Sequence, residues 1–296
     1  MVSESKFIII DGPAVLHRAW HALPKLTDPK GRVISAVYGF ASLLLKLLRE
    51  QQPQYLVVAF DTPAPTFRHQ EYKEYKATRL PQPQEFYDQF PIIKDLLKTF
   101  GIKILEKDGY EADDLIGALV KKSSLNNLIV TGDLDALQLV NSKTQVYFLR
   151  QGISEVKVYD REAIENRYGL SPKRLIDLKA LRGDLSDNIP GVRGIGEKTA
   201  LSLIQKFGSL ENVYQHLDEI REPVRNLLKE QKEQALLSKK LVTIKSDIPE
   251  VNSVEKYHLE KINREKIKKK FEELGFQSLI KRLEKEEQEK QQKTLF

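Results

Sequence analysis

The sequence contains no cysteine, and this absence excludes several kinds of chemistry at once. Disulfide bonds, zinc sites with thiolate ligands, iron–sulfur clusters and cysteine nucleophiles are all ruled out. Any bound metal must therefore be held by oxygen or histidine ligands. The sequence also lacks an N-terminal signal pattern and any apolar run long enough to span a membrane. We expect a soluble cytoplasmic protein with no membrane partner.

The composition is that of an ordinary globular protein with a small excess of positive charge. The 296 residues are 41% hydrophobic and 30% charged, which suffices for one large α/β domain or two smaller ones. Lys and Arg number 48 against 42 Asp and Glu, so the net charge is +6. A basic balance is compatible with a polyanionic partner but does not demonstrate one.

The order of apolar and amphipathic segments divides the chain into three parts. Up to about residue 160, short apolar runs alternate with helical segments, which predicts βαβ units, a largely parallel sheet and an α/β catalytic domain over 1–160. Residues 161–283 have mostly helical patterns, including a long charged helix expected over 223–244, and predict a helical lobe. The charged end, 284–296, is expected to be a flexible tail.

Nine acidic residues lie at expected strand ends, at one helix start and in one loop. Taken singly, each is explained as well by helix capping or surface charge. Gathered at the carboxyl edge of one sheet, where ligands bind, they would raise one another's pKa and require cations. Oxygen-only ligands favour Mg²⁺, for which Mn²⁺ can substitute, and their number indicates two or more ions. The candidate ligands are Asp11, Asp61, Glu111, Asp113, Asp114, Asp133, Asp135, Asp184 and Asp187.

Two divalent ions about 4 Å apart stabilise both the attacking and the leaving oxygen of a displacement at phosphorus. The acidic cluster therefore predicts phosphodiester hydrolysis, and the strongly basic remainder of the chain suits a nucleic-acid substrate. A phosphatase with an aspartyl nucleophile would need D-x-D-x-[TV] at a strand end. Neither Asp11 nor the pair Asp133 and Asp135 stands in such a motif, which argues against this class.

Residues 62–83 form a long, proline-flanked excursion from the βαβ pattern that is rich in basic and aromatic residues. Excursions of this length are usually binding loops or lids. Aromatic residues among cations suit stacking on unpaired bases together with phosphate contacts, and a merely solubilising loop is the alternative. The residues concerned are Phe67, Arg68, Tyr72, Tyr75, Lys76 and Arg79.

A glycine-rich hairpin is expected between two helices at about 184–207. It differs from a P-loop because Glu197 occupies the lysine position and no strand precedes it. A hairpin of this kind can present backbone N–H groups to a DNA phosphate, and an ordinary interhelical turn is the alternative. The candidate DNA-binding residues are Gly191, Arg193, Gly194, Gly196, Lys198 and Thr199.

Five sequence blocks, in order, resemble the 5′-nuclease domain of bacterial DNA polymerase I, a member of the flap endonuclease superfamily. The blocks are VYGFASLLLKLL, AFDTPAPTFRHQEYKEYKATR, GYEADDLIGALVKK, TGDLDALQL and GDLSDNIPGVRGIGEKTA. The resemblance runs from about residue 6 to 283. It implies a PIN-like, mostly parallel mixed sheet flanked by helices, a helical arch at 62–83 and a helix–three-turn–helix at the glycine hairpin. In one departure, Leu134 replaces the usual lysine between Asp133 and Asp135.

The resemblance also implies an activity, a cofactor and roles for single residues. The activity is that of a structure-specific 5′-3′ exonuclease and flap endonuclease on 5′ flaps, nicks and RNA-primed ends, in replication and repair. The nine acids match the metal positions of the family, and K⁺ is implied at the hairpin. Arg18, Lys76 and Arg79 match catalytic residues, while Phe67, Arg68 and Tyr72 match DNA-binding positions. We expect a monomer associated with the bacterial nucleoid.

A non-catalytic module of the same fold that binds branched DNA is the alternative function. Pure binding would not require the three acids of the GYEADD block, which argues against it. The chain ends in Gln292-Lys293-Thr294-Leu295-Phe296, which is similar to the Q-x-x-L-F peptide by which bacterial replication proteins bind the sliding clamp. Gln292, Leu295 and Phe296 are therefore candidate clamp-binding residues, with chance as the alternative. A functional peptide at this position would favour a stand-alone enzyme.

Overall fold

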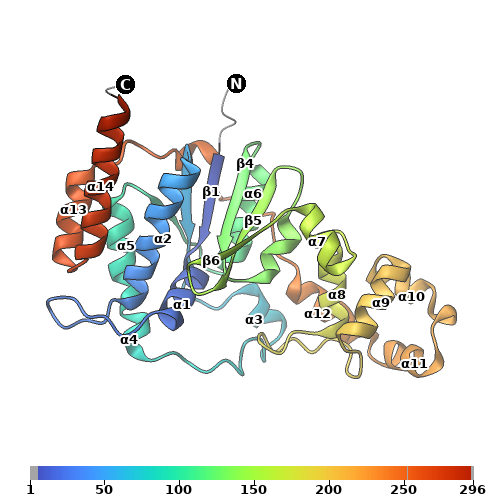
Figure 1. Cartoon of the computed structure of the whole chain (residues 1–296). Coiled ribbons are helices and arrows are strands. Elements are labelled where there is room, and N and C mark those ends of the chain that lie inside the picture. Colours follow the sequence, from blue (N-terminus) through green and yellow to red (C-terminus); the bar gives the residue numbers. More distant parts are fainter. Residues whose placement is uncertain (1–5, 252, 295–296) are drawn as a thin grey trace.

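The computed structural model describes residues 6–251 and 253–294, which form a six-stranded sheet flanked by helices with a helical lobe beside it (Figure 1). The strand order is β3-β2-β1-β4-β5-β6. The first five strands of this order are parallel and β6 is antiparallel to β5, which confirms the predicted mixed, mostly parallel sheet. The strands are β1 (Lys6–Asp11), β2 (Tyr55–Ala59), β3 (Lys103–Leu105), β4 (Asn126–Thr131), β5 (Thr144–Gln151) and β6 (Glu155–Tyr159).

The central strands are apolar on both faces because helices cover both sides of the sheet. In β1, Ile10 belongs to the core on one side and Ile9 to the core on the other. The register pairs Asp11 at the end of β1 with Ala59 at the end of β2, and Ile10 with Val130 in β4. The residues that follow β1, β2 and β4 therefore meet at one edge of the sheet.

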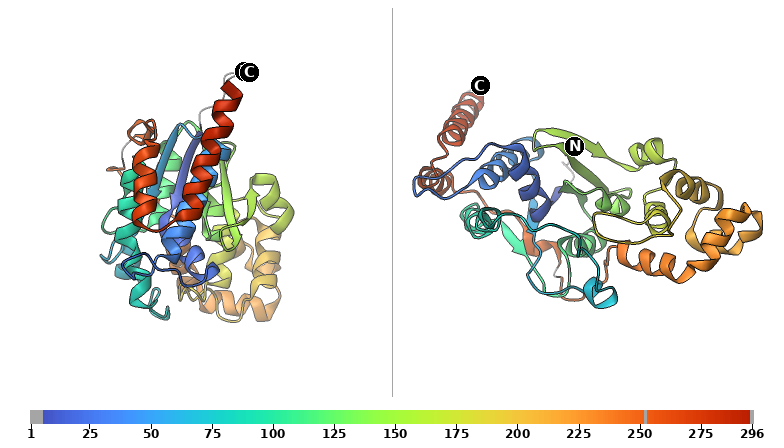
Figure 2. Two further views of the ribbon diagram at one scale, coloured as in Figure 1. Left: turned by 60° about the vertical axis from the view of Figure 1, so that its left-hand side comes forward. Right: turned by 90° about the horizontal axis from the view of Figure 1, so that it is seen from below.

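The helices of the sheet domain form a layer on each face (Figure 2). The first layer comprises α1 (Gly12–Ala22), α2 (Ser35–Gln51), α4 (Gln84–Tyr87), α5 (Gln89–Thr99), α13 (Arg264–Glu273) and α14 (Gln277–Thr294). The second comprises α6 (Ala112–Lys122), η1 (Leu134–Leu139), α7 (Arg161–Tyr168) and η3 (Val254–Tyr257). Among the described residues, no helix is both long and apolar enough to cross a membrane.

The helical lobe has a hydrophobic core of its own. The single long helix expected over 223–244 is instead two helices, because the chain turns at Gln231. The elements of the lobe are α8 (Arg174–Arg182), α9 (Glu197–Phe207), α10 (Leu210–Gln215), η2 (Leu217–Glu219), α11 (Glu222–Glu230) and α12 (Lys232–Val242).

After α12 the chain leaves this lobe and returns to the sheet domain. Residues 264–283, expected in the helical lobe, lie beside α2 and α5, and Phe271 and Leu279 belong to the same core as Phe40. The stretch expected to be a flexible tail is helical as far as Thr294. Its Glu, Lys and Gln residues favour helix, and ion pairs such as Arg282 with Glu286 support the turns.

The excursion at 62–83 follows the carboxyl edge of the sheet, along the bottom of the molecule in Figure 1. Only α3 (Phe67–Glu71) is helical within it, and the remainder consists of turns and extended chain. A capping box formed by Thr66 and His69 begins α3, and prolines border the segment on both sides. The helical arch implied by the resemblance is thus represented here by one short helix and a loop.

Candidate metal centre and nucleic-acid interface

The carboxyl edge of the sheet gathers the acids that end its central strands. Asp11 is buried and caps α1, accepting from the Ala14 N–H at 3.1 Å and from the Thr131 hydroxyl at 2.6 Å. Asp61, two residues beyond β2, accepts from the Ala112 N–H at 2.6 Å. Hydrogen bonds therefore join the ends of β1 and β4, and join the end of β2 to the first residue of α6.

The acids after β4 are held by the turn into η1. The Asp133 N–H donates to Thr131 at 2.9 Å, and the Asp133 carboxylate accepts from the Asp135 N–H at 2.9 Å. Leu134 is partly buried against the core of the second face, so the residue that departs from the family pattern has a packing role. Asp133 and Asp135 are both half-buried at the site.

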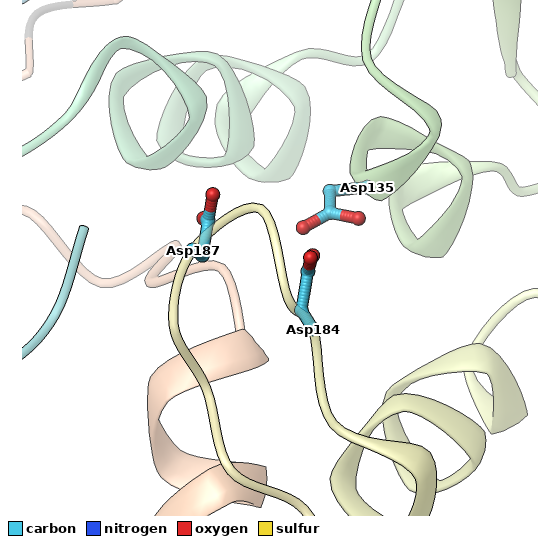
Figure 3. Close-up of side chains that lie close together, drawn as sticks. All are labelled: Asp135, Asp184 and Asp187. Carbon is cyan, nitrogen blue, oxygen red and sulfur yellow. The ribbon is translucent and has the colours of Figure 1, made fainter. Parts of the chain in front are cut away.

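Asp135 meets two acids from the loop that joins α8 to α9. One carboxylate oxygen from each of Asp135, Asp184 and Asp187 lies within 4.8 Å of the others (Figure 3). Two backbone hydrogen bonds close the loop. The N–H of Asp184 donates to the Ile189 carbonyl and the N–H of Ile189 donates to the Asp184 carbonyl, each at 2.8 Å. Three carboxylates at this separation form an oxygen-only donor set, and such donors fit Mg²⁺ or Mn²⁺.

Lys179, in the last turn of α8, lies between two of these three acids. Its ammonium group pairs with Asp135 and, at 2.5 Å, with Asp184. Its side chain is 13% exposed. Sequence analysis did not single out this lysine, although a basic residue in the last helical turn before an acidic loop is a signal that could have identified it.

The excursion supplies further cations to the cluster. Lys76 pairs with Glu111 at 2.6 Å, and Arg79 pairs with Asp187 at 2.5 Å. Tyr75, expected to stack on bases, is instead 3% exposed, and its hydroxyl lies 3.0 Å from Glu111 and 3.2 Å from Asp187. The expectation was wrong for Tyr75 because its ring packs beneath the segment, beside Ile189 and Leu241.

Arg68 also departs from its expected role as an exposed phosphate contact. It is 3% exposed and donates to both oxygens of the fully buried Asp114, at 2.7 and 2.9 Å, and to Glu111 at 3.2 Å. The Asp114 oxygens also accept from the N–H groups of Glu111 and Lys245. Each oxygen of Asp114, which was predicted to be a metal ligand, thus already accepts hydrogen bonds from two donors, and the side chain is fully buried.

Burial and charge shift the pKa values of the acids in opposite directions. Burial raises the pKa of Asp11 to about 7 and, with repulsion from its neighbours, that of Asp135 to about 6. Burial and the surrounding carboxylates also raise the pKa of Asp113 well above its ordinary value. Burial would likewise raise the pKa of Asp184, but Lys179 outweighs it and holds that pKa at about 2. Part of the cluster therefore lacks compensating positive charge.

Two further predicted residues are placed beside the cluster. Arg18 on α1 donates to the Gly132 carbonyl at 2.9 Å, next to Asp133, so it supports the turn that carries this acid. Phe67 is half-buried beneath two cations, with the Lys245 ammonium 3.9 Å and the Arg68 guanidinium carbon 4.5 Å from the ring centre. Tyr72 is half-buried against the cluster around Tyr75.

The glycine hairpin lies between α8 and α9, with one part buried and one part exposed. Gly191 has φ of +63°, and a Cβ there would lie 2.2 Å from the Gly183 nitrogen, so glycine is required for close packing. Gly196 at the start of α9 faces open space. The exposed residues are Arg193, Gly194, Gly196 and Lys198, and Thr199 is half-buried.

Comparison with known sequence families decides the relationship of the chain. Residues 6–169 match the family described as the 5′-3′ exonuclease N-terminal resolvase-like domain, and residues 170–265 match the 5′-3′ exonuclease C-terminal SAM fold. The chain belongs to the 5′-3′ exonuclease family. The family boundary at 169/170 lies just before α8, where the helical lobe begins.

DNA polymerase I proteins are among the relatives of this chain. DNA polymerase I of Bacillus subtilis (strain 168) is 42% identical over 296 residues, covering 99% of this chain and 34% of that protein. DNA polymerase I of Bacillus caldotenax is 42% identical over 285 residues, covering 95% of this chain and 32% of that protein. The chain thus spans about a third of the length of these relatives.

Comparison with solved structures shows which fold this chain shares. T5 5′-exonuclease with bound zinc matches with a TM-score of 0.67 at 23% identity, covering 81% of this chain and 90% of that one. The T5 D15 flap endonuclease in a complex with DNA and metal ions matches with a TM-score of 0.70 at 20% identity, covering 91% of this chain and 99% of that one. The Rad2 catalytic core with DNA matches with a TM-score of 0.62 at 18% identity, covering 92% of this chain and 88% of that one. These matches confirm the flap-endonuclease-like fold.

Proposed function

We propose that this chain is a structure-specific, divalent-metal-dependent nuclease that hydrolyses DNA and RNA-primer phosphodiesters from 5′ ends and at the base of 5′ flaps, in replication and repair. The observation that carries the proposal is the cluster of Asp135, Asp184 and Asp187 at the carboxyl edge of the sheet. Membership of the 5′-3′ exonuclease family supports it. T5 and Rad2 structures of the same fold were determined with DNA, which supports a DNA substrate.

The acidic cluster offers two halves that would each hold a divalent ion. Asp135, Asp184 and Asp187 form one donor set, and Asp11, Asp61, Asp113 and Asp133 surround the other. We propose Mg²⁺ as the ion, with Mn²⁺ able to replace it, because these ligands are carboxylates. Bound ions would stabilise the charge that develops on the phosphate oxygens during hydrolysis. Glu111, predicted as a further ligand, is paired with Lys76 and Arg68 in this structure and would reach an ion by leaving Lys76.

Lys76 and Arg79 would contact the phosphate by leaving their present carboxylate partners. Both come from a loop rather than a rigid element, and the Arg79 side chain is 50% exposed, so it can turn toward a bound strand. Arg18 would keep the turn at Gly132 in place. Tyr72 and Phe67 would line the path of an unpaired 5′ strand, because each presents a half-buried ring beside these cations.

The glycine hairpin would bind the duplex part of the substrate. Its exposed Arg193 and Lys198 flank Gly194 and Gly196, where backbone N–H groups can approach a phosphate closely. Thr199 lies in the first turn of α9, and Gly191 maintains the turn from within. We propose K⁺ as an ion bound between hairpin carbonyls and DNA.

The C-terminal pentapeptide would tether the enzyme to a sliding clamp. Leu295 and Phe296 lie outside the described residues, and Gln292 is described only as part of the helical backbone of α14. A tether would raise the local concentration of nuclease at nicks without a new DNA contact. We place the protein, as a monomer, in the bacterial cytoplasm at the nucleoid.

The deciding experiment offers the chain a 5′-labelled flap, a nicked duplex and p-nitrophenyl phosphate, each with Mg²⁺ and with EDTA. The proposal predicts cleavage of the flap and processing at the nick only with Mg²⁺, and no release of p-nitrophenol. Flap binding without cleavage would instead identify a non-catalytic branched-DNA module. Hydrolysis of p-nitrophenyl phosphate would identify a phosphatase.

A further inference from the structure

The acidic cluster is unevenly compensated by positive charge. Asp11, Asp113 and Asp133 have no ion-pair partner among residues 6–251 and 253–294. In the other half, Asp135 and Asp184 share the ammonium group of Lys179. A divalent ion arriving at the cluster therefore meets unneutralised carboxylates in one half and a resident cation in the other.

Lys179 is fixed in this place more firmly than the cations of the excursion. It belongs to α8, whose backbone is helical up to Arg182, and its side chain is 13% exposed. Arg79, which pairs with Asp187, lies on a loop and its side chain is 50% exposed. Moving Arg79 needs only a change in a surface loop, whereas Lys179 must be displaced from between two half-buried carboxylates.

The oxygen atoms that hold Lys179 are those that a metal ion would use. Asp135 and Asp184 are two of the three residues in the oxygen-only donor set, and the ammonium lies at 2.5 Å from Asp184. A divalent ion bound to the same oxygens would lie within a few ångströms of the ammonium, and two like charges at that separation repel strongly in a partly buried site. The two cations cannot both occupy the set in this arrangement.

We propose that Lys179 is a resident counter-cation that weakens binding of the second metal ion, so that the half of the cluster around Asp135, Asp184 and Asp187 fills after the half around Asp11, Asp113 and Asp133. The inference rests on the proposed function, because it assumes that these acids hold metal. Lys179 acts through the acids and is a positioning residue. A DNA phosphate entering the site would take over the ammonium and free the oxygens for the ion, which couples loading of the second ion to substrate binding.

The test is a Mn²⁺ titration of the full chain without DNA, in which electron paramagnetic resonance of free Mn²⁺ counts the bound ions. Lys179→Met keeps most of the side-chain stem and removes the charge. Lys173→Met removes one exposed charge from the start of the same helix and is the matched control. Lys179→Arg keeps the positive charge and shows whether charge rather than shape is responsible.

The proposal predicts one tight and one weak Mn²⁺ ion in the wild type. The second affinity should rise on the order of tenfold or more in Lys179→Met and stay near the wild-type value in Lys173→Met and Lys179→Arg. Mn²⁺ should also raise the unfolding temperature of Lys179→Met more than that of the wild type, which provides a second readout. An unchanged or lowered second affinity in Lys179→Met would overturn the role of Lys179 and leave the nuclease proposal intact. Absence of bound Mn²⁺ in all four proteins would overturn both.

Discussion

Arg68 joins three segments that are far apart in the sequence. Its guanidinium donates to Asp114 on α6 and to the carbonyls of Leu241 and Thr243, where α12 leads back to the sheet. It is the only partner among the described residues that neutralises the fully buried Asp114. The helical lobe is thereby fastened to the start of α6, close to the acids.

We predict that Arg68→Met is strongly destabilising. The substitution leaves the fully buried Asp114 without its cation, while Glu111 keeps Lys76, and the loss of one partner of a buried pair costs about 3–5 kcal/mol of unfolding free energy. Arg79→Met, the matched variant at a half-exposed pair, should cost less than about 1 kcal/mol. Urea denaturation of both variants measures these values. A stable Arg68→Met protein that has lost DNA affinity would restore the original assignment of Arg68 as a phosphate contact.

We also predict that stability without metal depends on pH. The pKa values of Asp11 and Asp135, about 7 and about 6, exceed the ordinary value of 3.8, so the folded chain binds protons more tightly than the unfolded chain. Their contribution to stability is therefore complete below about pH 4 and is lost as the pH rises toward 7. The pKa of Asp184 is lowered to about 2, so its contribution to stability is lost as the pH falls, but only below about pH 4.

Thermal unfolding in EDTA at several pH values checks this prediction. The midpoint temperature of unfolding should decrease as the pH is raised from 4 to 7. Saturating Mg²⁺ should restore this temperature, and the effect should be larger toward pH 7, because metal binding competes with these protons. A midpoint in EDTA that rises steadily over the same range would contradict the raised pKa values.

At the scale of elements, the excursion and the glycine hairpin would contribute different contacts to the proposed substrate. The excursion lies over the acids and is fastened to their loop, with the Lys76 N–H donating to the Asp187 carbonyl and the Asn188 side chain donating to Glu74. The exposed part of the hairpin is fastened to the turn between α11 and α12, through paired hydrogen bonds between Arg193 and Gln231. The two surfaces can therefore be altered separately.

For the excursion, we predict that replacing Lys76 and Arg79 together with Ala slows 5′-end processing while hairpin-dependent duplex binding persists. Phosphate contacts are lost on one surface only, so the slope of log affinity against log salt should decrease by roughly one to two units. Cleavage rates and binding at several salt concentrations measure both effects. An unchanged rate and slope would show that the excursion is a loop without a DNA contact.

For the hairpin, we predict opposite outcomes for two glycines. Gly191→Ala forces a Cβ to within 2.2 Å of the Gly183 backbone at a φ of +63°, so it should destabilise the hairpin and weaken duplex binding. Gly196→Ala adds a methyl group in open space and should leave stability within about 0.5 kcal/mol of the wild type. Denaturation and duplex binding of both variants test the pair. Equal stability would contradict the close-packing role of Gly191.

At the scale of the whole molecule, the sequence predicts what depends on chain order and misses what depends on long-range packing. The meeting of Asp11, Asp61 and Asp133 follows from strands that end in acids within a parallel sheet. The pairing of Arg68 with Asp114 could not be predicted, because it depends on how the excursion folds back over α6. The pairing of Lys179 with Asp135 could not be predicted either, because it depends on the docking of the helical lobe on the sheet domain. For the same reason, the return of α13 and α14 to the sheet domain is not visible in their charged sequence.

The two lobes together complete the acidic cluster. The sheet domain supplies Asp135, and the loop that begins the hairpin supplies Asp184 and Asp187, so the proposed metal-binding set exists only when the lobe is docked. This arrangement would place the duplex held by the hairpin and the strand to be cleaved in a fixed relation. Hydrolysis at a defined distance from the duplex end is the expected consequence.

The most direct measurement of the central claim is single-turnover cleavage of a 5′-labelled flap with Mg²⁺ by the wild type and by Asp135→Asn, with DNA binding measured on the same preparations. Asn keeps the shape of the side chain and removes the charge that would bind the ion. The account predicts a loss of cleavage of at least about a hundredfold with binding within a few-fold of wild type, because the bound ion stabilises the transition state more than the ground state. Full cleavage by Asp135→Asn, or equal cleavage by the wild type with Mg²⁺ and with EDTA, would contradict it.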